Sequence, residues 1–368
     1  MAIDWRDQRH TDKLTFLMVD PSNIDVTIGE LTGVELSGSS VVASYYTDTR
    51  TSASLTLHDS NYVRGSFIRI IHEVPEWNYR NVLGTYIVTD ESADRSNGEW
   101  VTKLDMKSRL WGLSSDYPAN AWGIGAGTMV NNAVEDVFRS CGFKHKALSP
   151  NDRRISQAMV LESDKSQLQR LFALMKSGNN RLDVDPYGYI TYGKYVSPAD
   201  KTPSMTIDLA DEYGIVQDSI SRDTDWTSIP TRVTVLFKWT DDVNGKSVDR
   251  QIVGRANATG EHSIARRGFC MDDLHNESDL QPRNQWRANQ LANQYLQNDQ
   301  HEKVEWSLTT MYVPLWEGDV VNVVVHDGEE RFRGTRKCLV KEVEIGLEKM
   351  SMKLTLKETA SGDKGDEE

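Results

Sequence analysis

Residues 308–325 read LTTMYVPLWEGDVVNVVV, and this stretch decides the fold that we expect for the chain. The apolar alternation of its first half breaks at Pro314, and a turn sequence follows at Glu317-Gly318-Asp319. Five of the next six residues, 320–325, are valine. A β-branched run bounded by a turn is typical of a buried strand. The stretch therefore predicts a strand, a turn and a second, buried strand.

A stretch near the start of the chain has the same spacing. Leu55 precedes Gly65 by ten residues, just as Leu308 precedes Gly318. Strand and turn signals are common, so one matched spacing would carry little weight. Two further matches make the pattern informative, because they predict that one β unit is used twice. A second strand starts with Gly-Thr in each copy, at Gly84 and at Gly334, and a leucine follows each of these glycines by twenty residues, at Leu104 and Leu354.

Length and charge limit the classes of protein. The 368 residues predict two to three domains, each with its own core. The formal charge is −13 and the pI about 5.2, and no basic cluster is longer than Arg266-Arg267. A protein that grips duplex DNA needs a basic stripe, so this class is not favoured. The acidity itself has two readings, general solubility or a surface that repels passing nucleic acid, and composition does not choose between them.

The chain carries no signal for export, membrane insertion or a disulfide framework. No apolar run approaches the roughly 18 residues of a membrane span, and the N-terminus lacks a signal-peptide core. We therefore expect folding in a cytosol. The three cysteines, Cys141, Cys270 and Cys338, are odd in number and far apart, so we expect buried apolar residues.

The coarse pattern predicts a mainly β chain with an α/β insert, an α+β class. Residues 1–112 show short strands between Gly and Ser turns, which favour a sandwich or barrel. Residues 113–203 form the α/β insert. The second β unit spans 204–358 and contains a helical insertion near 280–299. The acidic tail, 359–368, is predicted to be disordered.

Local signals give the boundaries of helices and turns. A first helix is predicted from an N-cap at Thr128 to Gly142, and a second from a capping box at Asp164 and Gln167 to Gly178. The other predicted features are a third helix starting at Pro282, hairpin turns at 185–188 and Asn244-Gly245, and an exposed acidic loop at 266–280.

We weighed four motifs as sites. Gly123, Gly125 and Gly127 lack the spacing and the leading strand of a dinucleotide-binding loop, so a plain loop before a helix is favoured. Asp183 and Asp185 are better explained by a hairpin turn than by calcium. The four acidic residues and the histidine of 271–279 resemble metal ligands most, but they match no known ligand spacing, and a solvated loop is favoured. They are Asp272, Asp273, His275, Glu277 and Asp279.

The histidines show no catalytic arrangement. None of the eight belongs to a His-x-x-x-His pair or a nucleophile elbow. His72 and His326 follow similar places in the two copies, which duplication explains better than joint chemistry. We therefore predict no enzyme activity, no catalytic residues, no cofactor and no metal.

The order of these elements resembles the tail hub family of bacteriophages. That family includes the baseplate hub of contractile tails, the tail-tip hub of long flexible tails and the hub part of type VI secretion spikes. The resemblance covers about residues 14–357. The residues that carry it are Leu171–Met175 with Gly178, Leu182–Tyr195 with Pro198, and Pro314–Val325.

This resemblance implies two tail-tube-like β-barrels per chain and assembly as a homotrimer. Three chains with two similar units each would form a pseudo-sixfold ring, joining a sixfold tube to a threefold tip. The implied partners are the tail tube or distal tail protein above, and a tip, spike or central fibre protein below. The tape measure protein and transiting DNA would occupy the lumen of a virion tail assembled in the host cytoplasm.

The sequence departs from hubs that continue into a β-helix, fibre or hydrolase, because it stops about ten residues after the second β unit. We therefore expect puncturing or lytic activity to belong to another protein. The alternative function is a receptor- or carbohydrate-binding module, in which exposed Trp77, Tyr79 and Trp316 stack on sugars. For the hub, we expect subunit contacts along the duplicated strands, at Phe67, Ile68, Ile70, Val320, Val321, Val323, Trp316 and Trp77.

Overall fold

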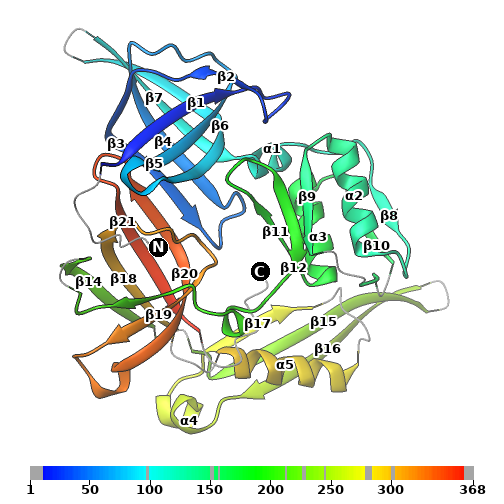
Figure 1. Cartoon of the computed structure of the whole chain (residues 1–368). Coiled ribbons are helices and arrows are strands. Elements are labelled where there is room, and N and C mark those ends of the chain that lie inside the picture. Colours follow the sequence, from blue (N-terminus) through cyan, green and yellow to red (C-terminus); the bar gives the residue numbers. More distant parts are fainter. Residues whose placement is uncertain are drawn as a thin grey trace. The chain divides into compact units, whose positions relative to one another are not determined.

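The computed structural model describes residues 11–359, apart from 97–98, 150–152, 156–157, 212–213, 226–228, 244–245, 278–283 and 300–302. The chain divides into two compact units, which we describe separately (Figure 1). Unit 1 is built from Met1–Ile220 and Ser307–Leu356, and unit 2 mainly from Ser221–Trp306. Except for Thr359, the predicted acidic tail lies outside the described residues.

One large sheet, in which thirteen strands can be followed within the described residues, lies mainly in unit 1, and its strand segments 221–225, 303–306 and 357–358 are assigned to unit 2. Its first half comprises β1 (Lys13–Val19), β2 (Thr27–Glu30), β3 (Val34–Ser44), β4 (Thr51–His58), β5 (Phe67–Val74), β6 (Tyr79–Ser96) and β7 (Glu99–Ser108). Its second half comprises β13 (Met205–Asp208), β14 (Ile215–Asp225), β18 (Lys303–Met311), β19 (Val320–Val325), β20 (Gly334–Gly346) and β21 (Ser351–Glu358). The strand order is β14-β18-β21-β20-β3-β4-β7-β6-β5-β1-β2, and β19 pairs with both β20 and β13.

The predicted repeat is confirmed by the strand pairing. The first copy pairs in the order β4-β7-β6-β5 and the second in the order β18-β21-β20-β19. Gly65 and Gly318 precede the corresponding strands with φ of +89° and +84°, a left-handed conformation that favours glycine. The second glycine pair is less equivalent, because Gly84 faces Ile70 inside β5 while Gly334 faces Val325 at the end of β19.

We call β3–β7 copy 1, and β14 together with β18–β21 copy 2, since β3 pairs with β4 as β14 pairs with β18. Alternating burial gives each copy its core: Leu55 on β4 faces Leu104 on β7, and both are fully buried. Leu308 and Leu354 are buried at the matching places of β18 and β21. Burying each such leucine is worth about 1.5–3 kcal/mol.

The predicted mainly β class is confirmed, and the two tube-like barrels stay a prediction. The strand order has two ends, at β14 and β2, so within the described part of the chain neither half forms a closed ring of paired strands. Both copies are instead joined in one sheet, because β3 pairs with β4 on one edge and with β20 on the other.

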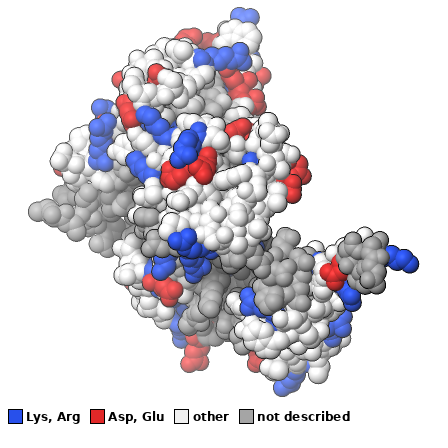
Figure 2. Space-filling model, turned by 90° about the vertical axis from the view of Figure 1, so that its right-hand side faces the viewer, with Lys and Arg blue, Asp and Glu red and all other residues white. Residues whose placement is uncertain are grey.

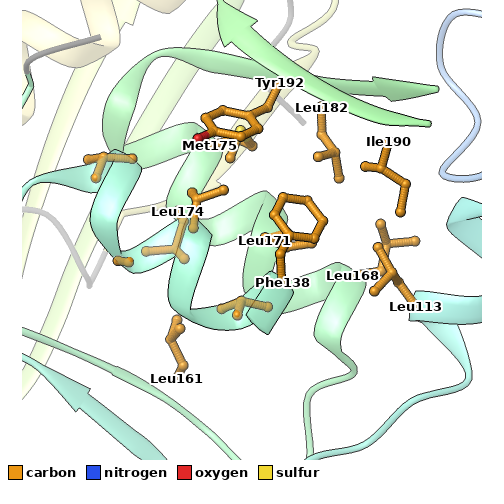
Figure 3. Close-up of a cluster of buried hydrophobic side chains, with 14 of the residues drawn as sticks. Leu113, Phe138, Leu161, Leu168, Leu171, Leu174, Met175, Leu182, Ile190 and Tyr192 are labelled. Carbon is orange, nitrogen blue, oxygen red and sulfur yellow. The ribbon is translucent and has the colours of Figure 1, made fainter. Parts of the chain in front are cut away.

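The α/β insert between the copies follows the predicted pattern. Its elements are α1 (Leu110–Ser114), β8 (Trp122–Ile124), α2 (Val130–Cys141), β9 (His145–Ser149), β10 (Met159–Leu161), α3 (Gln167–Gly178), β11 (Asn180–Val184) and β12 (Ile190–Lys194). Figure 3 shows Phe138 of α2 and Leu171 of α3 packed beneath Leu182 and Tyr192 of the strands. The predicted turn at 185–188 connects β11 and β12, which pair antiparallel.

The ends of the helices correct two predictions. Thr128 is not the N-cap of α2, because its segment pairs with 153–155 (Ile155 donates to the Thr128 carbonyl, 2.8 Å), and Met129 precedes the helix instead. The capping box of α3 lies at Ser166 and Gln169, two residues beyond the predicted pair. Gly142 ends α2 in the left-handed conformation, as predicted.

Unit 2 is a three-stranded sheet covered by a helix. It contains β15 (Arg232–Val243), β16 (Lys246–Asn257), α4 (Ile264–Arg267), β17 (Asp272–Asn276) and α5 (Gln285–Asp299). Val243 faces Lys246, so the predicted hairpin is confirmed, although residues 244–245 and the predicted helix start at Pro282 lie outside the described residues. The helix packs closely on β16, since a Cβ at Gly254 would lie 2.2 Å from the Ala288 carbonyl carbon.

The short 3₁₀ turns are η1 (Pro75–Trp77), η2 (Pro198–Asp200), η3 (Gly260–His262) and η4 (Glu330–Phe332).

The prediction of an exposed acidic loop at 266–280 is wrong in its middle part. Asp272–Asn276 is β17, which pairs parallel with β15. Cys338 is buried as predicted, but Cys141 is half-buried and Cys270 is exposed.

Candidate functional site at the junction of the two copies

The two copies meet along a short antiparallel ladder between β3 and β20, which we call the internal seam. Five residue pairs form it, from Ser40–Gly346 to Ser44–Glu342. Backbone hydrogen bonds extend it at both ends, from Tyr45 N to the Lys341 carbonyl (2.8 Å) and from Leu347 N to the Ser39 carbonyl (3.0 Å). On one face of the seam the side chains are apolar and buried, at Val41, Ala43, Val343 and Ile345, whereas Glu342 and Glu344 on the other face are exposed. Copy 1 and copy 2 are therefore held together by both a backbone ladder and a shared core.

At one end of the internal seam the turn of copy 2 packs on Tyr45. Gly318 donates to the Val340 carbonyl (2.9 Å), and Val340 donates back to the Asp319 carbonyl (2.8 Å). The Asp319 carboxylate also accepts from Trp316 N at 2.8 Å. A Cβ on Gly318 would lie 3.1 Å from the Tyr45 ring, so glycine satisfies both the left-handed backbone and the close approach.

A cluster of charged residues surrounds this contact, of which Glu317 is buried and the others are half-buried. The Arg181 guanidinium stacks 3.8 Å from the Tyr45 ring centroid and donates from Nε to Asp183 at 2.9 Å. Arg50 donates to the Tyr45 carbonyl, and Lys201 Nζ donates to the Gly318 carbonyl at 2.7 Å. We call the junction cluster the set of three cations and three carboxylates Arg50, Arg181, Lys201, Asp183, Glu317 and Asp319.

Burial dominates the electrostatics of the junction cluster. It raises the pKa of Glu317 well above its usual value, an effect that the neighbouring Asp183 increases and Arg181 opposes. Burial also raises the pKa of Asp319, and it lowers the pKa of Arg50 and of Lys201. In these four groups, removal from water is the largest single cause of the pKa shift.

Arg181 is the best-paired cation of the cluster. Burial, the largest single effect, would lower its pKa, but Asp183, Tyr45 and Glu317 together outweigh burial and the pKa rises. Three buried atoms have no hydrogen-bond partner among the described residues, namely Arg50 Nε, Arg181 Nη2 and Glu317 Oε2. A cluster of this kind favours one arrangement of the four chain segments that carry it, since other arrangements would leave more charge uncompensated.

A second junction fixes the insert to copy 1 through the tip of the β11–β12 hairpin. Arg69 on β5 donates to the carbonyls of Ile24 (2.8 Å) and Tyr187 (3.0 Å). Thr85 donates to the Pro186 carbonyl at 2.9 Å, and Arg109 donates to the Gly188 carbonyl at 2.8 Å. These contacts were not predicted from the sequence, although an arginine at position 69 inside the apolar run Phe67–Ile71 could have indicated them.

The predicted interface residues fall into two groups. Five of them are at most 2% exposed and belong to the core of the chain: Ile68, Ile70, Val320, Val321 and Val323. The other three, Phe67, Trp77 and Trp316, are half-buried. The backbone edges, rather than the five core side chains, are therefore what remains available for subunit contacts, and the interface itself stays a prediction.

The aromatic residues considered for sugar binding are not fully exposed. Trp77, Tyr79 and Trp316 are each half-buried. The Tyr79 hydroxyl lies 3.1 Å from the hydroxyl of Tyr312, whose ring packs against His72 with ring centroids 4.5 Å apart. The expectation of exposed stacking platforms is wrong for these three residues.

The weighed metal ligands have other partners. Asp272 accepts from Thr234 (2.7 Å), Glu277 from the Tyr295 hydroxyl (2.7 Å), and Asp273 lies 2.8 Å from His275. Asp279 lies outside the described residues. Over the described ranges, no three acidic, histidine or cysteine side chains gather in a way that could hold a metal ion.

The histidines of the two copies differ in surroundings. His72 is fully buried and its Nε2 lies 2.7 Å from Asp12, whereas His326 is exposed and its Nε2 lies 2.8 Å from Asp208.

Positive and negative charges are mixed at the surface. On the face drawn in Figure 2, basic and acidic side chains of the described residues are interspersed rather than gathered in one stripe. Of the helices in the described residues, none is long and apolar enough to cross a membrane.

Comparison with solved structures identifies the fold. A tail protein from Neisseria meningitidis MC58 has a TM-score of 0.64 at 11% identity, over 96% of this chain and 98% of that one. The 43 kDa tail protein of prophage MuSo2 from Shewanella oneidensis has a TM-score of 0.61 at 12% identity, over 94% and 98% of the two chains. The chain has the fold of phage tail proteins.

This tail-protein fold extends over nearly the whole chain. A third similar structure, prophage tail protein gp18 from Listeria monocytogenes EGD-e, has a TM-score of 0.58 at 12% identity and covers 93% of this chain and 94% of that one. No protein-family model matches the sequence, and no curated protein matches it. The resemblance found in the order of elements is thus confirmed by structure, where sequence identity alone is too low to find it.

Proposed function

We propose that this chain is a structural hub of a phage tail or baseplate, assembled as a homotrimer. The observation that carries the proposal is the repeat: two copies with the same strand order are joined edge to edge within one chain. The similarity to phage tail proteins over more than nine-tenths of the chain supports the same conclusion.

The repeat offers a way to join two symmetries. Three chains with two copies each present six similar units, which is the number needed to stack on a sixfold tail tube. The same three chains present threefold symmetry wherever the copies differ, as a tip or central fibre requires. A ring closes when one edge of each chain fits the opposite edge of the neighbouring chain.

The proposed ring would surround the path of the DNA. Three chains carry a formal charge of −39, three times the −13 of one chain, and this balance disfavours adhesion of the polyanion. The proposed neighbours are the tube or distal tail protein on one side and the tip, spike or fibre protein on the other. The tape measure protein and DNA would make only non-specific contact with the lumen.

Mass measurement tests the trimer. We expect purified chain at micromolar concentration to give three times the 41.7 kDa of one chain by native mass spectrometry and light scattering. A stable monomer under these conditions would contradict the proposal. Labelled antibody against the chain, imaged on tail particles, tests the position, and label anywhere other than the junction of tube and tip would also contradict it.

A further inference from the structure

The internal seam provides a template for a contact between chains. On one edge β3 pairs with β4 of copy 1, and on the other edge residues Ser40–Ser44 pair with Glu342–Gly346 of β20 in copy 2. One strand thus connects the two copies. Because the copies have the same strand order, each partner in this contact has a counterpart in the other copy.

The counterpart of β3 is β14. It pairs with β18 just as β3 pairs with β4, and Met311 N donates to the Gly214 carbonyl (3.2 Å) where this pairing begins. However, β14 is the last strand of the order. Within the described part of the chain, no strand takes the place on its second edge that β20 takes on β3.

The counterpart of β20 is β6. In copy 2, β19 covers β20 from Gly334 to Leu339, and β3 takes over the same edge at Glu342. In copy 1, β5 covers β6 only as far as Tyr86. β6 continues to Ser96 in the long hairpin with β7, but no described strand takes over its edge beyond β5 (Figure 1).

The direction of the backbone groups agrees with this correspondence. Tyr45 N bonds to the Lys341 carbonyl, so Lys341 and, by alternation, Val343 direct their backbone groups at β3. The facing pairs Ile68–Tyr86 and Val321–Cys338, matched through Gly65 and Gly318, set a spacing of 252 between β6 and β20, which relates Val343 and, by the same alternation, Ile345 to Glu91 and Ala93 of β6.

The hairpin gives the same answer independently. Ser96 faces Glu99 across a two-residue connection, and a pair that closes such a connection exchanges hydrogen bonds. Counting back in twos, residues 94 and 92 also bond to β7. Glu91 and Ala93 lie between them, so their backbone groups face the other, uncovered edge.

We propose that β14 of one chain pairs antiparallel with the uncovered edge of β6 in a neighbouring chain, repeating the internal seam between chains. This inference rests on the proposed trimer and names the surface that closes it. Each chain offers one β14 edge and one β6 edge, so the contact is head-to-tail, and three such contacts close a ring. In that ring every copy meets the next through the same kind of ladder.

The seam between chains differs from the internal seam in its side chains. Val41, Ala43, Val343 and Ile345 bury apolar surface in the internal seam, whereas residues 90–95 of β6 are exposed and mostly polar. The contact between chains therefore depends mainly on backbone hydrogen bonds. For this reason a change that removes a single backbone N–H at the edge is a sensitive test.

Proline at position 93 makes that change. Ala93→Pro removes an N–H that faces the uncovered edge and leaves the β6–β7 bonds in place, the strand position where proline is tolerated. Ala93→Ser keeps the N–H and is the matched control. Glu30→Pro on β2, at the opposite end of the sheet, controls for proline in an edge strand. We expect trimers from wild type, Ala93→Ser and Glu30→Pro, and folded monomers from Ala93→Pro by native mass spectrometry.

The outcomes separate the two proposals. A trimeric Ala93→Pro protein would overturn the β14–β6 seam while leaving the trimeric hub intact. A monomeric wild-type protein would overturn the hub and, with it, the seam. If Ala93→Pro fails to fold, hydrogen exchange of wild type decides instead. We expect the amide protons of Glu91 and Ala93 to exchange at least about tenfold more slowly in the trimer than in monomer obtained by dilution. Equal exchange rates would overturn the β14–β6 seam.

Discussion

Replacing the two turn glycines by alanine tests whether the copies share a backbone but differ in surroundings. Gly65 and Gly318 have φ of +89° and +84°. Alanine in this left-handed region costs about 1–2 kcal/mol at either position. A Cβ at Gly65 would have nothing within 4 Å, whereas a Cβ at Gly318 would lie 3.1 Å from two carbons of the Tyr45 ring.

The expected difference follows from this crowding. The Tyr45 ring has little room to retreat, because the Arg181 guanidinium stacks 3.8 Å from its centroid. Overpacking of a buried contact costs about 1–3 kcal/mol. Gly318→Ala should therefore lower the free energy of unfolding by about 2–5 kcal/mol, against about 1–2 kcal/mol for Gly65→Ala. Urea unfolding followed by tryptophan fluorescence measures both, as a shift of the midpoint at constant slope.

Repeating Gly318→Ala in a Tyr45→Leu background tests whether the Tyr45 contact causes the additional loss of stability. In a Tyr45→Leu protein the smaller side chain leaves room for the new methyl group, so the excess cost of Gly318→Ala should shrink toward that of Gly65→Ala. Equal losses at both glycines in the native background would refute the reasoning. If Gly318→Ala keeps its extra loss of unfolding free energy with Leu at position 45, that loss does not arise from the Tyr45 contact.

Three further changes test the junctions. Because folded Glu317 holds its proton more tightly than the unfolded chain, wild-type stability should fall as the pH rises from about 4.5 through the folded pKa. Glu317→Gln mimics the protonated form and does not titrate. Its urea midpoint should therefore rise relative to that of wild type over the same pH range, and a midpoint difference that stays constant with pH would contradict this. Val321→Asp or Val323→Asp buries an unpaired charge in β19 at a cost of several kcal/mol, so soluble trimers from either variant would be unexpected. Arg69→Met removes the donors to Ile24 and Tyr187, so the amides of Asp185, Tyr187 and Gly188 should exchange faster, whereas exposed Arg64→Met should leave them unchanged.

The parts of the fold that could be predicted are those whose signal is local. The helix from Val130 to Cys141 shows a stripe of buried residues at helical spacing, and the valines of 320–325 mark a buried strand. The repeat could be predicted because its turn glycines need a left-handed backbone in both copies. The first glycine of each copy matched in structure, while Gly84 and Gly334 fell at different registers.

The parts that sequence reasoning missed depend on contacts between distant segments. β17 is polar, with the sequence Asp-Asp-Leu-His-Asn, and becomes a strand only because β15 offers a free edge. The junction cluster brings together Arg50, Arg181 and Glu317, which are more than a hundred residues apart in sequence, so no spacing rule could indicate it. The internal seam was missed for the same reason, since neither β3 nor β20 carries a mark of its partner.

Most of unit 2, residues 226–302, lies between β14 and β18 in the chain, the place that the short connection Tyr45–Arg50 takes between β3 and β4. One loop position therefore holds a six-residue turn in copy 1 and a whole folded unit in copy 2. In the proposed ring these would alternate, so that the backbone ladder repeats six times while the appended units repeat three times. The change from sixfold to threefold order would then need no special adaptor protein. It would follow from the lengthening of a single loop in one of two duplicated halves.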